Sequence, residues 1–71
     1  MSKEVRSPMP GVIMEIQVKE GDKVAEDDEL LIIEAMKMEN TIYSPSNGTV
    51  KEIKVKKKDI VDADQLLMVI E

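Results

Sequence analysis

The chain contains one pattern twice: residues 4–34 read EVRSPMPGVIMEIQVKEGDKVAEDDELLIIE, and residues 41–71 read TIYSPSNGTVKEIKVKKKDIVDADQLLMVIE. A shift of 37 positions aligns the two stretches without a gap. Among the 31 aligned positions, 13 pairs are identical: Ser7/Ser44, Pro8/Pro45, Gly11/Gly48, Glu15/Glu52, Ile16/Ile53, Val18/Val55, Lys19/Lys56, Asp22/Asp59, Val24/Val61, Asp27/Asp64, Leu30/Leu67, Ile33/Ile70 and Glu34/Glu71. Self-similarity of this extent predicts that both copies fold into the same unit.

Each copy predicts four short strands separated by turn signals. The expected strands are 5–7, 12–18, 23–24 and 30–33 in the first copy, and 42–44, 50–55, 60–61 and 66–70 in the second. Pro8 and Pro10 end the first strand, and Gly21 marks a turn. Stretch 25–38 also has the propensity for a helix, but its counterpart 62–71 is short and ends the chain, which favours strands.

The repeat also predicts how the strands assemble. Four short strands cannot bury an apolar face alone, so the two copies must pack together. The predicted fold is all-β: a flattened eight-stranded barrel or sandwich of two four-stranded antiparallel sheets, with an internal pseudo-twofold repeat. At this length we expect residues 1–71 to form one domain.

The core must be built from Val, Ile, Leu and Met, because Trp and Phe are absent. Within 12–18, Val12, Met14, Ile16 and Val18 alternate with other residues, so we predict that these four side chains share one face. Ile16 and its repeat mate Ile53 are therefore expected in the core.

The composition argues against several classes of function. The chain has no Cys and no His, which removes disulfides, reactive thiols, and the commonest general base and metal ligand. A formal net charge of −5, with Tyr43 as the only aromatic residue, argues against nucleic-acid binding. There is no long apolar run and no signal peptide, so we expect a cytoplasmic protein without direct membrane contact.

Six residues between the copies, 35–40 (AMKMEN), are not duplicated. A pseudo-twofold places this connection at one pole of the molecule and both chain ends at the other. The natural geometry is a two-residue hairpin turn centred on Met36-Lys37. Such turns favour Asn-Gly or Asp-Gly, so Met-Lys is a strained choice that suggests a functional role for the exposed Lys37.

Ala35-Met36-Lys37-Met38, within IIEAMKMEN, resembles the attachment motif of the biotinyl domain family, the biotin carboxyl carrier part of biotin-dependent carboxylases. Residues 7–11 (SPMPG) and 18–24, with their Gly-Asp turn, are also similar to that family. The resemblance extends over 4–71. The family often has Gly where this chain has Asp27, Lys58 and Asp64. Asp tolerates left-handed conformations, so Asp27 and Asp64 fit a shared turn, whereas we expect a rearranged or slightly strained turn at Lys58.

The resemblance implies a fold, a cofactor and partners. The fold is biotinyl/lipoyl-like, and biotin is covalently attached to Lys37, with Ala35, Met36 and Met38 completing the attachment motif. A biotin protein ligase forms the amide. The biotinylated domain then shuttles carboxyl groups between the sites of a biotin carboxylase and a carboxyltransferase or decarboxylase. The domain itself is a non-catalytic carrier.

Two alternatives stay open from the sequence. Related lipoyl domains usually have Asp before the lysine and Ala after it, whereas this chain has Met36 and Met38, which favours biotin over lipoate or dual attachment. The second alternative is an unmodified β-sandwich that serves as an interaction domain. The mass of the expressed protein distinguishes all three hypotheses.

Overall fold

The computed structural model describes residues 2–71, which form eight strands and no helix. All eight predicted strands are confirmed: β1 (Lys3–Arg6), β2 (Gly11–Ile16), β3 (Lys23–Val24), β4 (Glu29–Ala35), β5 (Met38–Tyr43), β6 (Gly48–Ile53), β7 (Ile60–Val61) and β8 (Leu66–Ile70). The main difference is that β4 and β5 extend further toward each other than predicted, because they pair along their whole length. In the part of the chain that is described, no helix could cross a membrane.

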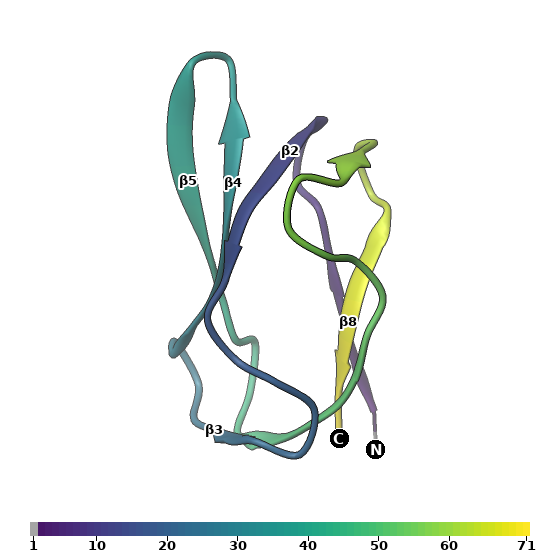
Figure 1. The fold of residues 1–71 in the computed structure, drawn as a ribbon. Helices are drawn as coiled ribbons and strands as arrows, with labels where there is room; N and C mark the ends of the chain where they lie inside the picture. The colour runs from purple at the N-terminus through teal and green to yellow at the C-terminus, as the bar shows by residue number, and fades with distance from the viewer. Residues whose placement is uncertain (1) are drawn as a thin grey trace.

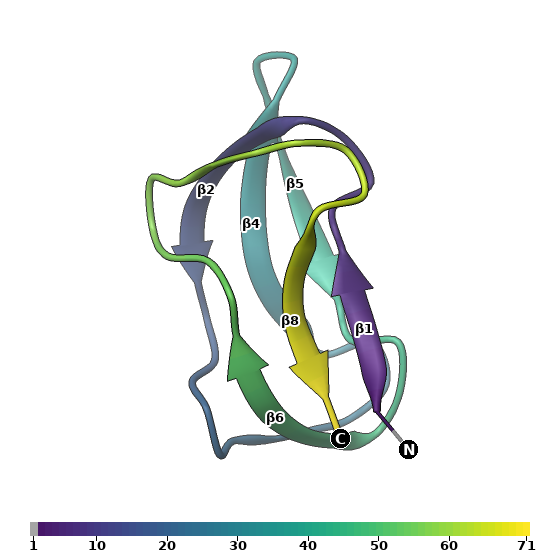
Figure 2. The ribbon, with the colours of Figure 1, turned by 90° about the vertical axis from the view of Figure 1, so that its right-hand side faces the viewer.

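The strands form two four-stranded antiparallel sheets, in the orders β1-β8-β6-β3 and β5-β4-β2-β7 (Figures 1 and 2). The 37-residue shift converts β1, β2, β3 and β4 into β5, β6, β7 and β8, and so converts the first order into the second. The predicted pseudo-twofold therefore exchanges the two sheets. Each sheet takes two strands from each copy, so the copies interlock and neither forms a sheet of its own.

A β-bulge in β2 interrupts the alternation of side chains that the sequence predicts. Ile13 pairs with Ile33, but the next pair is Glu15 with Ile32, so Met14 is an extra residue in its strand. Buried Ile13 consequently faces the core, whereas Met14 is only half-buried. The prediction that one face carries every second residue from position 12 is wrong, because the bulge moves the pattern by one position. The second copy repeats this bulge between Val50 and Glu52.

The core lies between the sheets and is nearly the same in both copies. Ile16 and Ile53, predicted as core residues, are partly buried and pack against its edge. The fully buried positions form repeat-related pairs: Ile13/Val50, Leu30/Leu67, Leu31/Met68 and Ile33/Ile70. Aliphatic residues and Met68 thus fill the interior without an aromatic side chain.

The identical pair Gly11/Gly48 is explained by the close packing of the strands in both copies. A Cβ atom at Gly11 would lie 2.6 Å from the carbonyl oxygen of Glu34 and 2.6 Å from Cγ2 of Ile33. At the equivalent Gly48, a Cβ would lie 2.7 Å from Cγ2 of Ile70. All three distances are far below van der Waals contact, so only glycine allows β2 and β6 to approach their neighbours this closely. In the first copy this approach holds β2 against the end of β4.

Three turns between strands hold a non-glycine residue at positive φ. Asp27, Lys58 and Asp64 have φ values of 72°, 78° and 66°. The Asp27 and Asp64 amides donate equivalent hydrogen bonds, to the carbonyl oxygens of Ser44 (2.9 Å) and Ser7 (2.7 Å). The expectation of a strained turn at Lys58 is therefore confirmed.

We expect Lys58→Gly to stabilise the domain by about 0.5–1 kcal/mol, because glycine adopts a positive φ without the steric cost that a Cβ imposes. Gly21 occupies the equivalent position in the first copy, with a φ of 95°. Thermal unfolding checks the prediction, with an expected rise of roughly 2–8 °C in Tm. Gly21→Ala is the opposite control: its Cβ would meet no atom within 4 Å, so a lower Tm there isolates the cost of the backbone angle. An unchanged or lower Tm for Lys58→Gly would contradict the argument.

The two ends of the chain lie side by side at one pole (Figures 1 and 2). Lys3 of β1 pairs with Ile70 of β8, and the Ser2 hydroxyl donates to the Glu71 carboxylate at 3.1 Å. Lys51 Nζ contacts the same carboxylate at 3.1 Å. The hydrogen bonds from Lys51 and then Ser2 lower the pKa of Glu71. This pole is therefore closed by β1–β8 pairing and by polar contacts.

Candidate functional site

The β4–β5 hairpin projects from the pole opposite the chain ends (Figure 2). Its strands pair from Glu29 and Tyr43 at the base to Ala35 and Met38 at the tip. The molecule is elongated, with extents of 32 × 17 × 17 Å. The hairpin is the connection that the repeat leaves unduplicated, and it forms the end of the long axis.

The turn has the predicted two-residue form. Ala35 pairs with Met38, so Met36 and Lys37 are the two central residues, with φ values of 54° and 65°. Two positive values are the mark of a type I′ turn, whose twist matches that of the strands. Each non-glycine residue in this region costs about 1–2 kcal/mol, which the β4–β5 pairing must offset. The backbone therefore holds Lys37 in one defined place at the tip.

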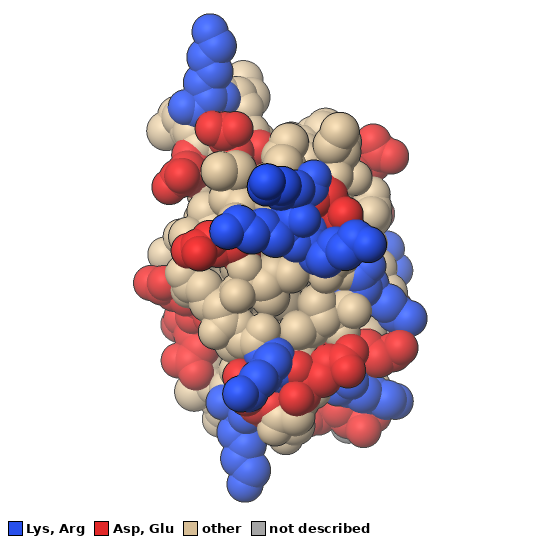
Figure 3. All heavy atoms as spheres, viewed as in Figure 1, with Lys and Arg blue, Asp and Glu red and all other residues tan. Residues whose placement is uncertain are grey.

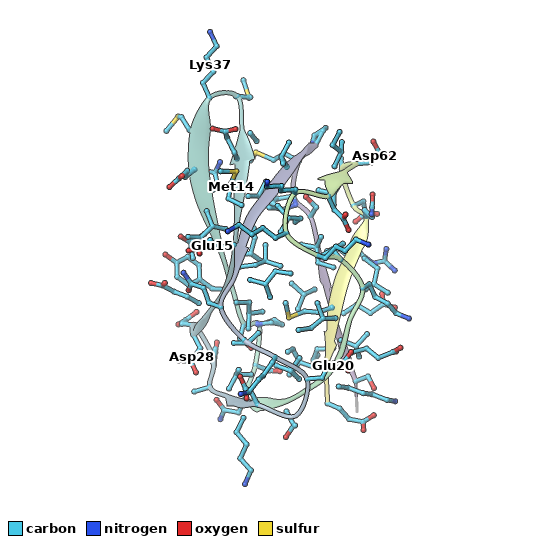
Figure 4. The ribbon with its side chains drawn as sticks, viewed as in Figure 1. Met14, Glu15, Glu20, Asp28, Lys37 and Asp62 are labelled. Atoms are coloured by element: carbon cyan, nitrogen blue, oxygen red, sulfur yellow. The ribbon has the colours of Figure 1, made fainter. Side chains whose placement is uncertain are left out.

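Lys37 is exposed and points away from the body of the molecule (Figure 4). Met36 is 90% exposed and Met38 is 66% exposed. Ala35 differs from the other three predicted site residues, because it is buried and belongs to the hydrophobic core. The structure thus brings all four residues together, with Ala35 anchoring the tip and the other three in solvent.

Polar groups surround the base of the tip. Glu34 of β4 pairs directly with Glu39 of β5, and both are exposed. The Asn40 amide Nδ2 donates to the carbonyl oxygen of Met38 at 3.3 Å. Figure 3 shows acidic side chains close to the basic group at this end of the molecule, where Figure 4 labels Lys37 in the same view. None of the ion pairs among residues 2–71 includes Lys37.

Asn40 was not among the predicted site residues, whereas Glu34 and Glu39 fit contact with a ligase and ordinary solvated strand charges equally well. The signal for Asn40 was present, because a short amide side chain often bonds to a nearby backbone carbonyl in turns. The predicted two-residue turn already places Glu34 opposite Glu39, a pairing of like charges that destabilises a strand pair, and the structure has this register. Residues 2–71 contain no cavity and no group of three or more potential metal ligands.

Comparison with known proteins identifies a family and relatives that include a carboxylase chain and a decarboxylase subunit. A family described as "Biotin-requiring enzyme" matches residues 3–70. The chain is 56% identical over 41 residues to the mitochondrial propionyl-CoA carboxylase alpha chain of Homo sapiens, a match that covers 58% of this chain and 6% of that protein. It is 60% identical over 38 residues to the glutaconyl-CoA decarboxylase subunit gamma of Acidaminococcus fermentans, covering 54% of this chain and 26% of that subunit.

A solved structure extends the similarity to the whole fold. The crystal structure of the Kluyveromyces lactis urea carboxylase contains a region that matches 100% of this chain and 6% of its own, with a TM-score of 0.94 and 32% sequence identity. The chain thus spans only a small part of the proteins it matches. With a family match over nearly its full length, the chain belongs to the biotin-requiring enzyme family, as a carrier domain for covalently attached biotin.

Proposed function

We propose that Lys37 is the residue that carries biotin, through an amide at its Nζ atom. The observation that supports this most strongly is the position of Lys37 at the tip of the unduplicated hairpin, exposed and opposite the chain ends. Amide formation requires a primary amine that another protein can surround. Lys37 meets this requirement, since it projects into solvent and takes part in no ion pair within residues 2–71.

The residues around Lys37 contribute position rather than chemistry. Bound biotin supplies a ring nitrogen that accepts a carboxyl group at one site and releases it at another. The type I′ turn fixes the start of the arm, and buried Ala35 ties the turn to the core. The four-carbon stem of Lys37 stays flexible beyond that point. Tethering raises the effective concentration of the carried group at each partner site to roughly the mM range.

The partners of this domain follow from the same proposal. A biotin protein ligase attaches the cofactor, a biotin carboxylase loads the carboxyl group, and a carboxyltransferase or decarboxylase consumes it. The names of the relatives, two carboxylases and a decarboxylase subunit, support this class of reaction. In this proposal residues 1–71 act as one non-catalytic carrier domain, in the cytoplasm.

The cofactor proposal is tested by intact mass. The domain is expressed with biotin, lipoate and both attachment enzymes present. Its intact mass is measured first, and tryptic peptide mapping then locates any modification. We expect one biotinyl group per chain, on the peptide that contains Lys37, and no lipoyl group. A lipoyl group alone would establish a lipoyl carrier, and an unmodified chain beside an active ligase would indicate an interaction domain.

A further inference from the structure

The methionines of this chain differ sharply in their exposure. Met36 is 90% exposed and Met38 is 66% exposed, whereas Met68 is 0% exposed. Met9 and Met14 are half-buried, and Met9 packs against the core. Among residues 2–71, the two most exposed thioethers thus stand immediately on either side of the proposed attachment lysine.

The fold itself gives no reason for methionine at these two places. Neither Met36 nor Met38 belongs to the hydrophobic core or packs against it among the described residues. Met36 also holds a positive φ of 54°, at which a side chain with a Cβ is costly. Two large apolar side chains kept in solvent at a strained turn indicate a role outside the folding of this chain.

We propose that Met36 and Met38 form an oxidation-sensitive switch, in which conversion of their thioethers to sulfoxides blocks modification of Lys37. The proposal rests on the proposed function of Lys37. It treats the two methionines as a reversible modification site, with a hydroperoxide as the oxidant.

The reaction is a two-electron oxygen transfer. A sulfur lone pair of the methionine attacks one peroxide oxygen, so that an S–O bond forms while the O–O bond breaks. The proton on the transferred oxygen passes to the leaving oxygen, which departs as water from hydrogen peroxide or as an alcohol from an organic peroxide. The sulfur is oxidised by two electrons and the peroxide is reduced by two. Methionine sulfoxide reductases reverse the change.

The hairpin geometry connects this chemistry to Lys37. A protein that encloses the amine at the tip must also cover the neighbouring side chains, because Met36 and Lys37 are the two central residues of one turn and Met38 follows directly. Covering a thioether removes apolar surface from water, which is favourable. Covering a sulfoxide removes a strong hydrogen-bond acceptor from water and is costly unless a donor meets it. Oxidation should therefore weaken binding of the hairpin tip by the ligase without unfolding the carrier domain.

The first measurement maps oxidation alone. The unbiotinylated domain is treated with limiting hydrogen peroxide, and oxygen addition is followed by peptide mass mapping. We expect Met36 and Met38 to react about tenfold or more faster than Met68, because susceptibility follows exposure. Equal rates at the three positions would overturn the proposal.

The second measurement follows the consequence for attachment. Oxidised and untreated domains are given to a biotin protein ligase, and the initial rate should fall about tenfold or more after oxidation. Treatment with the sulfoxide reductases should restore it. After peroxide treatment, a Met9→Leu/Met14→Leu/Met68→Leu variant should lose biotinylation rate as the wild type does. The Met36→Leu/Met38→Leu variant should be biotinylated at the same rate before and after peroxide treatment. An unchanged rate in the oxidised wild type, or an equal loss in Met36→Leu/Met38→Leu, would overturn the switch. Failure of the untreated wild type to accept biotin on Lys37 would instead refute the proposed function.

Discussion

Replacing Lys37 with arginine is expected to abolish biotin attachment and to leave the free energy of unfolding within about 0.5 kcal/mol of wild type. Arginine keeps the positive charge and a long flexible stem, but its guanidinium stays protonated and offers no nucleophilic amine. Lys37 is exposed and takes part in no ion pair among residues 2–71, so the fold loses nothing when it changes. Streptavidin blotting and intact mass measure the attachment, and thermal unfolding measures the stability.

Lys57→Arg is the matched control, since Lys57 is another exposed lysine in a turn. This variant should accept biotin at the wild-type rate. Biotin on Lys37→Arg would mean that another lysine carries the cofactor. Unfolding of Lys37→Arg would mean that the lysine has a structural task, which the exposed turn does not suggest.

Truncating Ile33 to alanine should lower the free energy of unfolding by about 2–5 kcal/mol, a large share of the stability of a domain of this size. Ile33 is 0% exposed, lies in β4, and contacts the region where Gly11 passes closest. The loss combines the apolar surface that is no longer buried with the cavity left behind. Its repeat mate Ile70, which is 1% exposed, should give a similar result. Urea titration, with the slope checked against wild type, measures the change.

Ile60→Ala is the matched control for this experiment. It removes the same atoms from a side chain that is 81% exposed, so a change of no more than about 0.5 kcal/mol is expected. Equal losses at Ile33 and Ile60 would show that burial does not decide the effect. A loss below 1 kcal/mol at Ile33 would show that the centre of the core lies elsewhere.

The repeat explains why so much of the fold could be predicted from the sequence. Each of the two aligned copies predicts the same four strands. The 37-residue shift that aligns the two sequences also converts the strand order of one sheet into that of the other. The faces of β2 could not be predicted in the same way. Val12, Met14, Ile16 and Val18 form an unbroken alternation, and a bulge leaves no mark in such a pattern because it depends on the register with β4.

The candidate site was predictable for a different physical reason. Met36-Lys37 breaks the residue preference of a tight turn, and the structure gives both residues the positive φ that makes them unusual. The burial of Ala35 and the hydrogen bond from Asn40 to Met38 were not predicted. The burial of Ala35 depends on how far the β4–β5 pairing extends beyond the body of the molecule, and hydrophobic patterning gives no signal for this in the polar run 39–41.

The placement of both chain ends at the pole away from Lys37 gives the folded body a second use, as a rigid spacer. A chain that continues from either end would hold the amine across the 32 Å length of the domain before the lysine stem begins. A flexible linker would need about 30–40 residues to match that distance as a root-mean-square span. Unlike such a linker, the paired strands lose no conformational entropy when they are extended. The length of the folded sheets therefore contributes to the distance that Lys37 can cover. With a short connection at the chain ends, the hairpin tip could move between sites that lie far apart.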